Sequence, residues 1–399
     1  MCFVVASAET DKVSSKGSTA HAMIEASIHV PLVAPLVGEE EIAAVGEVLR
    51  SGQLASGPEV AAFEREFARA TGAAHAVALN SGTAANHAAL VAMGIGDGDE
   101  VLVTPFTFAA TATPVLMQRA VPRFVDIDPR TFNLDPAAAL AAAGPRTKAA
   151  ILVDLFGLPL DPAGAPGFRE RGVRFLEDAC QAVGAYRGGR HAGLLGEAAS
   201  FSFYATKNLM TGEGGMLVTG DAGIAASARR FRQHGQGERY EYLSLGYNYR
   251  MTDLAAAIGR VQLRRLGELQ EARRANAAFY DAALGGIPGV TLPFVPEGAT
   301  HAYHQYSILI DRTATPNGAG RDEVRAHLSA REVGSGVYYP VPLHLHPLFA
   351  PLGYGPGDFP VAERVSASIL ALPVHPRLTR AQLEWTVRAV REAVGANHQ

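Results

Sequence analysis

The chain of 399 residues contains only two cysteines, Cys2 and Cys180. So few cysteines exclude a disulfide framework and a zinc site built mainly from cysteine, and they fit a reducing compartment. The sequence also lacks any run of about eighteen apolar residues, the length that a membrane-spanning helix needs. Internal repeats and low-complexity tracts are absent. We therefore expect a soluble, cytoplasmic protein that does not enter a membrane.

An excess of charge of one sign is also absent. The chain has 35 basic and 39 acidic residues, and its net charge is -4. This balance gives no basic field of the kind that nucleic-acid binding requires, so we expect a small-molecule partner. Hydrophobic residues make up 48% of the chain, which is enough for a large core. The length suggests about two or three domains.

The first 28 residues carry Asp11, Lys12 and Lys16 among Ser, Thr and Ala, without the apolar segment of a signal peptide. This composition predicts a disordered N-terminal extension over 1–28, and Met23 is a possible natural start. We expect a large domain over 29–284 and a smaller C-terminal domain over 285–399.

Short apolar segments alternate with helical or loop segments, which is the pattern of a largely parallel sheet with crossover helices. Strands are predicted at 76–79, 99–104, 121–125, 149–155, 173–176, 200–204 and 216–219. Helices are predicted at 38–50, 58–71, 84–93, 224–232 and 252–284. The second domain reads as α/β, with strands at 305–310 and 333–339 and a helix at 321–331.

Lys207 is the candidate nucleophile. It lies between the strand-like alternation of 200–204, in which Ser202 and Tyr204 share a face, and a glycine-rich turn at 212–215. A lysine held near apolar neighbours can lose its proton and attack a carbonyl group. The commoner alternative is a solvated surface lysine, so the assignment needs support from elsewhere in the chain.

A candidate anion site follows the first strand, where Asn80-Ser81-Gly82-Thr83 leads into a helix. Free backbone N–H groups, the helix dipole and two hydroxyl groups converge there, and a phosphate could bind. The alternative is an ordinary N-cap.

Three further features lie after strands or helices. Asp178 and Gln181 follow the strand at 173–176, at the sheet edge where α/β proteins bind ligands. Phe106 and Phe108 follow the strand at 99–104, and we expect one to stack on a planar ring and the other to pack in the core. The loop at 235–249 is too long for a simple connection, which indicates a function.

An anion turn, an aromatic ring, a buried acid and a lysine are together what pyridoxal phosphate chemistry needs. The chain resembles the DegT/DnrJ/EryC1/StrS family of sugar aminotransferases, within the type I fold of pyridoxal phosphate enzymes. The resemblance runs from about Val30 to Leu378. The segments that carry it are SGTAANHAAL at 81–90, GDGDEV at 96–101, EDACQAVGA at 177–185, SFSFYATKNLMTGEGG at 200–215, GYNYRMTDLAAAIG at 246–259 and LPVHP at 372–376.

The resemblance implies a large domain with a mixed, mostly parallel seven-stranded sheet flanked by helices, and a smaller C-terminal α/β domain. It implies that Lys207 binds the cofactor's aldehyde, Asp178 faces the ring nitrogen and Gln181 faces the ring hydroxyl. The remaining cofactor contacts that it implies are Gly82, Thr83 and Ser202 at the phosphate, Phe108 on the ring, and Asn248 reaching the phosphate of a neighbouring subunit. The active unit would then be a homodimer with shared sites.

The implied reaction moves an amino group from an amino acid, with L-glutamate as the expected donor, to a UDP- or dTDP-linked 3-keto or 4-keto sugar. Its pathway would make amino sugars, cell-surface polysaccharides or antibiotics. Substrate contacts are expected from Arg250, Tyr204, His301, Tyr338 and His344. His344 and His346 have the spacing of metal ligands, but no third ligand accompanies them, so we expect no metal.

Three other functions compete with this one. Relatives that dehydrate sugars replace the lysine with histidine, and a regulator without turnover would lose the lysine or the acid, whereas Lys207 and Asp178 are both present. A cyclitol or aminohydroxybenzoate-type ketone remains an alternative substrate. The chain departs from many members at Asp154, where they carry histidine, and at Cys180, where alanine is usual.

Overall fold

The computed structural model describes residues 28–396 apart from 162 and 164, so almost all of the predicted extension over 1–28 lies outside it. Its centre is a seven-stranded sheet in the order β1-β9-β8-β5-β4-β2-β3. β9 runs antiparallel to both of its neighbours, and the other pairs are parallel. The strands are β1 (His75–Leu79), β2 (Glu100–Val103), β3 (Val121–Phe124), β4 (Thr147–Val153), β5 (Arg174–Asp178), β8 (Ala198–Ser202) and β9 (Gly215–Thr219). This sheet confirms the predicted fold class, and each predicted strand of the large domain is present to within two residues.

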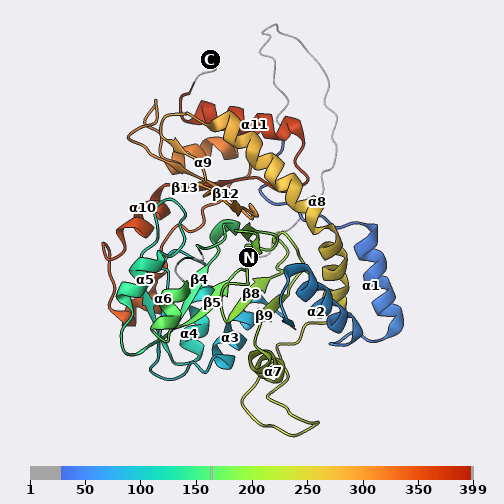
Figure 1. The fold of residues 1–399 in the computed structure, drawn as a ribbon. Helices are drawn as coiled ribbons and strands as arrows, with labels where there is room; N and C mark the ends of the chain where they lie inside the picture. The colour runs from blue at the N-terminus through green and yellow to red at the C-terminus, as the bar shows by residue number, and fades with distance from the viewer. Residues whose placement is uncertain (1–27, 162, 164, 397–399) are drawn as a thin grey trace.

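Helices cover both faces of the sheet, because its strands are apolar on both faces. One face packs on α3 (Gly82–Ala92), α4 (Thr113–Met117) and α7 (Ala222–Phe231). The other face packs on α2 (Pro58–Thr71), α5 (Pro136–Ala142), α6 (Ala165–Glu170) and the first half of α8 (Asp253–Leu284). Figure 1 shows α8 running from this lower body of the molecule to the upper one, beside α11.

The upper body contains a second sheet in the order β10-β12-β13, with all pairs antiparallel. Its elements are β10 (Val290–Thr291), β12 (Tyr306–Ile310), β13 (Ile369–Leu372), α9 (Arg321–Ala330), α10 (Pro360–Ser368) and α11 (Arg380–Ala393). A small third sheet joins β6 (Tyr186–Arg187), β7 (Arg190–His191) and β11 (Ala299–Thr300). The domain limits predicted at 284 and 285 remain a prediction. Phe349 and Phe359 pack with the central sheet, and Val30 packs under the second sheet.

The strand predicted at 333–339 is wrong. The segment makes only two isolated bridges, from Val333 to Val30 and from Gly336 to Ala371. The reason is that its backbone bonds go to two separate segments. The Gly334 N–H donates to the Val30 carbonyl at 2.8 Å and the Gly336 N–H to the Ala371 carbonyl at 3.1 Å, so no continuous ladder forms.

α1 (Glu39–Ser51) lies on α8, but α8 covers only a small part of the apolar side of α1. Val48 is buried, whereas Ile42 and Leu49 are 59% and 56% exposed. The helix contacts α8 through a buried polar pair, in which Gln262 Nε2 donates to Glu41 Oε1 at 2.6 Å. Apolar surface therefore remains uncovered on α1.

Candidate active site

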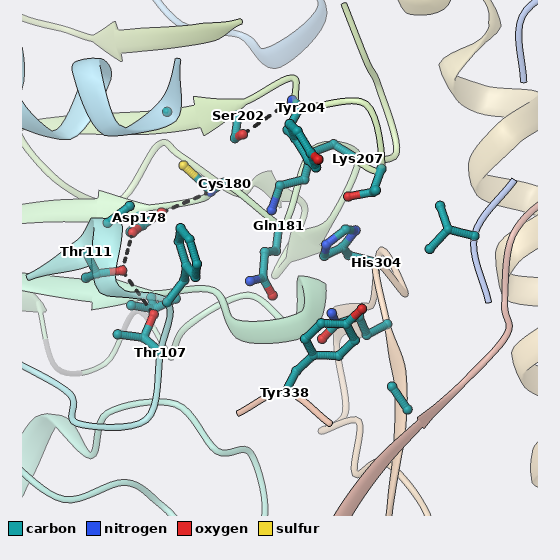
Figure 2. Close-up of a pocket in the computed structure, with 18 of the residues that line it drawn as sticks. Thr107, Thr111, Asp178, Cys180, Gln181, Ser202, Tyr204, Lys207, His304 and Tyr338 are labelled. Carbon is teal, nitrogen blue, oxygen red and sulfur yellow. Dashed lines mark hydrogen bonds between the residues drawn. The ribbon is translucent and has the colours of Figure 1, made fainter. Parts of the chain in front are cut away.

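A cavity of about 540 Å³ opens where β4, β5 and β8 end, between the two bodies of the molecule. Nine of the predicted site residues line it: Gly82, Thr83, Phe108, Asp178, Gln181, Ser202, Tyr204, Lys207 and Tyr338. Figure 2 shows Asp178, Gln181 and Lys207 arranged around one space, with His304 on the side next to Lys207. Topology explains the convergence, because the carboxyl ends of parallel strands meet at one edge of a sheet.

Asp178 is the last residue of β5, and three donors hold its carboxylate in place. Thr111 Oγ1 and Asn86 Nδ2 donate to Oδ2 at 2.8 and 3.1 Å, and the Cys180 backbone N–H donates to Oδ1 at 3.3 Å. Ser200 Oγ donates to Asn86 Oδ1 at 2.6 Å and so orients that amide. These three donors stabilise an acid that is only 4% exposed.

Sequence reasoning missed Asn86 and Thr111. A signal for Asn86 was available, because it lies four residues after Gly82 in α3 and so on the same helix face as the candidate anion site. Thr111 had no comparable signal. It lies in a short 3₁₀ turn, Ala109–Thr111, whose direction the sequence does not reveal.

Lys207 lies in a turn held on both sides. Its backbone N–H donates to the Tyr204 carbonyl at 2.8 Å, and Asn208 Nδ2 donates to the Ala302 carbonyl at 2.8 Å. Burial lowers the pKa of the Lys207 amine, while the nearby carboxylate of Asp178 acts in the opposite direction. The amine is therefore easier to deprotonate than that of a surface lysine.

At the start of α3, the backbone lies very close to the side chains of Cys180 and Ser202. A Cβ on Gly82 would stand 2.8 Å from Cys180 Sγ and 2.9 Å from Ser202 Cβ, so only glycine fits there. Ser81 caps the helix by accepting from the Ala84 N–H at 3.1 Å. The N–H groups of Gly82 and Thr83 precede the first intrahelical bonds and lie beside Ser202, which is a suitable environment for an anion.

The aromatic and amide predictions also meet in this cavity. Phe106 is fully buried and Phe108 is 61% exposed on the cavity wall, so one of the pair packs in the core as predicted. Gln181 Oε1 accepts from the Phe156 N–H at 2.7 Å, and its Nε2 donates to the Tyr339 hydroxyl at 3.2 Å.

The structure does not bring His301 or His344 to the cavity, although both were expected to contact substrate. His301 stacks on Tyr303 with ring centroids 4.2 Å apart, and His344 lies buried against Glu363 at 3.2 Å. His304 lines the cavity in their place. Burial lowers the pKa of His304 well below its usual value, so its ring is neutral. In the part of the chain that the structure describes, no cluster of three or more metal-ligating side chains occurs.

Asn248 and Arg250 also lie away from the cavity of their own chain. Arg250 Nη1 donates to Gln233 Oε1 at 3.3 Å, and Asn248 forms an isolated bridge with the same residue. Asn248 is exposed, and the loop over 235–249 projects below α7 in Figure 1. Any contact with a cofactor would therefore have to be made in another subunit.

The model of the DegT/DnrJ/EryC1/StrS aminotransferase family matches residues 35–391. The chain belongs to this family. The match spans both bodies of the molecule and every cavity-lining residue except Leu32 and Val33. It makes the chain an aminotransferase with the type I fold of pyridoxal phosphate enzymes.

Two relatives of this aminotransferase carry names that state a substrate. The UDP-N-acetyl-3-dehydro-alpha-D-glucosamine 3-aminotransferase of Acidithiobacillus ferrooxidans is 37% identical over 94% of this chain and 99% of its own. The dTDP-3-amino-3,4,6-trideoxy-alpha-D-glucose transaminase of Streptomyces venezuelae is 38% identical over 88% of this chain and 92% of its own. Among solved structures, the PLP form of the sugar aminotransferase Spr1654 of Streptococcus pneumoniae, described as putative, matches with a TM-score of 0.86 at 26% identity, over 92% of this chain and 99% of its own.

In the described part of this aminotransferase, no helix is long and apolar enough to cross a membrane.

Proposed function

We propose that this aminotransferase binds pyridoxal phosphate and moves an amino group from an amino acid to a nucleotide-linked keto sugar. The observation that carries the proposal is one cavity in which a partly buried lysine amine, a hydrogen-bonded aspartate and a glycine-cradled helix start face the same space. Each of the three has a separate chemical part in this reaction.

The residues present fit the cofactor. Pyridoxal phosphate supplies an aldehyde that binds amines and a ring that takes up the electron pair of a broken C–H bond. The N–H groups of Gly82 and Thr83 and the Ser202 hydroxyl would bind its phosphate. The Asp178 carboxylate, already fixed by Thr111, would keep its ring nitrogen protonated.

Two further side chains would complete the cofactor's surroundings. Phe108 would cover the ring face, and its large exposed area gives it the room to do so. Gln181 would bind the ring hydroxyl, and its bonds to Phe156 and Tyr339 already orient the amide.

Lys207 moves the protons. Its Nζ takes the proton from the α-carbon of the amino donor in the first half of the reaction and delivers a proton to the sugar carbon in the second. A pKa lowered by burial favours the neutral amine that the first transfer needs. Such positioned acid–base work contributes about 10²–10⁴-fold to a rate.

The proposed acceptor is a UDP- or dTDP-linked 3-keto sugar. The names of the two relatives described above both place the amino group at C3 of the sugar. Each alignment covers nearly all of the relative. The proposed donor is L-glutamate. Tyr204 and Tyr338, which line the cavity mouth, are the proposed sugar contacts in this chain.

The proposed active unit is a cytoplasmic homodimer in which Asn248 and Arg250 reach the partner's cavity. Uncovered apolar side chains support the dimer. They lie on α1 and on the loop over 235–249, at Ile42, Leu49, Tyr240, Leu243 and Leu245. Exposed apolar side chains of this kind are commonly covered at an interface between chains.

The test starts from the protein loaded with pyridoxamine phosphate. A panel of keto-sugar nucleotides and cyclitol ketones is added, and the absorbance of the pyridoxal form is followed in a single turnover. We expect a UDP- or dTDP-linked 3-keto sugar to restore that absorbance. A response only to cyclitol ketones would overturn the substrate class, and a response to no ketone would overturn the proposed function.

A further inference from the structure

Four buried polar atoms in the cavity wall have no hydrogen-bond partner in the described chain. They are Arg273 Nε, His304 Nδ1, Gln305 Oε1 and His375 Nδ1. Buried polar atoms are almost always paired, so a wall with four unpaired ones indicates that a polar ligand completes it. Gln305 Oε1 is an acceptor, and Arg273 carries the positive charge.

Arg273 is the unusual member of this wall. It is only 6% exposed, and its Nη1 donates to the Tyr303 carbonyl at 3.0 Å. No carboxylate of the described residues pairs with it, and burial alone lowers the pKa of Arg273 to about 10. A buried guanidinium without an acid is costly, and a bound anion would remove that cost.

Other arginines of α8 show what is missing. Arg260 pairs with Glu59 and Glu66 at 2.7 and 2.6 Å, and Arg265 lies 3.6 Å from Glu41. Both are more exposed than Arg273 and need a partner less. The acids come from α1 and α2, which pack on α8 and face these arginines. Among the described residues, none supplies an acid to Arg273, which faces the cavity.

The position of Arg273 limits which anion it can meet. Arg273 and Lys207 both line the main cavity and a second, smaller one beside it. The charges of both residues lower the pKa of His304, which therefore lies near each. An anion bound by Arg273 is thus close to the reacting amine. In an amino acid the carboxylate is attached to the carbon that bears the nitrogen, whereas the diphosphate of a nucleotide sugar lies farther from its ketone.

We propose that Arg273 binds the α-carboxylate of the amino donor and thereby restricts the donor to amino acids. The inference rests on the proposed function, which it deepens. Tyr303 occupies one end of the guanidinium and leaves the Nε edge for the two carboxylate oxygens, the geometry in which arginine binds carboxylates best. His304 is a neutral neighbour that adds no competing charge.

The test compares Arg273→Gln with a matched control, Asn276→Ala. Asn276 lies one turn further along α8, is also buried, and donates to the His375 carbonyl at 3.0 Å without lining the cavity. Both substitutions remove a buried side-chain bond to a carbonyl, but only one removes the cation.

Two measurements are made on the protein carrying pyridoxal phosphate. The first is binding of glutarate, a dicarboxylate that cannot react, by calorimetry. The second is the single-turnover conversion of the cofactor by L-glutamate. We expect Arg273→Gln to weaken glutarate binding about tenfold to a hundredfold, and to lower the L-glutamate rate at limiting concentration similarly, as the loss of a charge-assisted bond predicts. The second half-reaction, measured separately on protein loaded with pyridoxamine phosphate and a keto sugar that has no carboxylate, should change less than about twofold. Asn276→Ala should leave glutarate binding unchanged.

Three results would overturn the inference: wild-type protein that binds no glutarate, unchanged glutarate affinity in Arg273→Gln, or an equal loss in both half-reactions. If Arg273→Gln does not fold, Arg273→Lys keeps the charge without the fork and should give an intermediate loss of affinity. A protein that reacts with keto sugars while Arg273→Gln behaves as wild type would refute this inference alone. A protein that takes up no cofactor would refute the proposed function itself.

Discussion

Asp154 and Glu177 bury their carboxyl groups against each other, and neither is exposed to solvent. Glu177 accepts the N–H groups of Gly193 and Leu195 at 2.7 and 2.9 Å, and Asp154 Oδ1 accepts that of Leu160 at 2.8 Å. Two carboxyl groups hydrogen-bond only when one carries a proton. Burial and the charge of Glu177 raise the pKa of Asp154 well above its usual value, so Asp154 holds that proton.

This pair lies on the face of β5 opposite Asp178, because successive residues of a strand point to opposite faces. The Asp154 backbone N–H also donates to the Asp178 carbonyl at 3.0 Å. The pair therefore braces the strand end that carries Asp178. Histidine, which many members carry at position 154, could not share a proton in the same way.

The pair predicts how stability changes with pH. A carboxyl group whose pKa is raised on folding keeps a proton that the unfolded chain releases, so stability falls as pH rises above the ordinary aspartate pKa of about 3.9. Asp154→Asn removes this titration, and its amide can still donate to Glu177. We expect a flatter decline of the free energy of unfolding between about pH 5 and 8, measured by urea titration. The control Asp161→Asn, at a half-exposed acid, should keep the wild-type slope; an Asp154→Asn slope equal to wild type would contradict the shared proton.

Lys207 should be the point of cofactor attachment. Borohydride reduction of the yellow holoprotein should fix the cofactor irreversibly onto one lysine, and peptide mass mapping should find it on Lys207 among the chain's four, Lys12, Lys16, Lys148 and Lys207. Lys207→Gln should abolish the fixed label, whereas Lys148→Gln, at an exposed position, should not. Label on another lysine would refute the assigned nucleophile.

Asp178→Asn should retain some cofactor and lose at least about a hundredfold in single-turnover rate, because an amide cannot keep the ring nitrogen protonated. Thr111→Val removes one donor to the carboxylate and should cost about tenfold. Thr107→Val is the matched control, since Thr107 bonds only to Thr111, at 3.0 Å. Near-normal rates in Asp178→Asn, with cofactor content measured in parallel, would show that Asp178 does not keep the ring nitrogen protonated.

Shared active sites predict complementation between inactive variants. Lys207→Ala is mixed with the double variant Asn248→Ala, Arg250→Ala under conditions of subunit exchange. Each hybrid dimer should hold one intact site, because the two defects fall in the same cavity, so about a quarter of the wild-type activity should return in an equal mixture. Hybrids proven by native mass spectrometry but without activity would mean that Asn248 and Arg250 serve their own chain.

The sequence by itself determined the fold class and the centre of the site. Apolar segments that alternate with helices specify a mostly parallel sheet, and such a sheet gathers the residues after its strands at one edge. Asp178, Ser202 and Phe108 therefore follow from strand positions alone. Gly82 and Lys207 follow from short local motifs, in which the neighbouring residues decide the backbone conformation.

Only the tertiary structure decided which side chains complete the cavity. His304 lines it and His301 does not, because the His301 ring turns back to accept from the Tyr303 N–H at 2.8 Å and stacks on the Tyr303 ring. Arg273 is one of two adjacent arginines on a long helix, and helical periodicity does not tell which faces a ligand and which faces solvent. The segment over 333–339 has the composition of a strand, but its backbone bonds are divided between Val30 and Ala371, so it forms no continuous ladder. For Arg273 and for 333–339 the deciding contacts join residues far apart in the chain, and local pattern carries no information about such contacts.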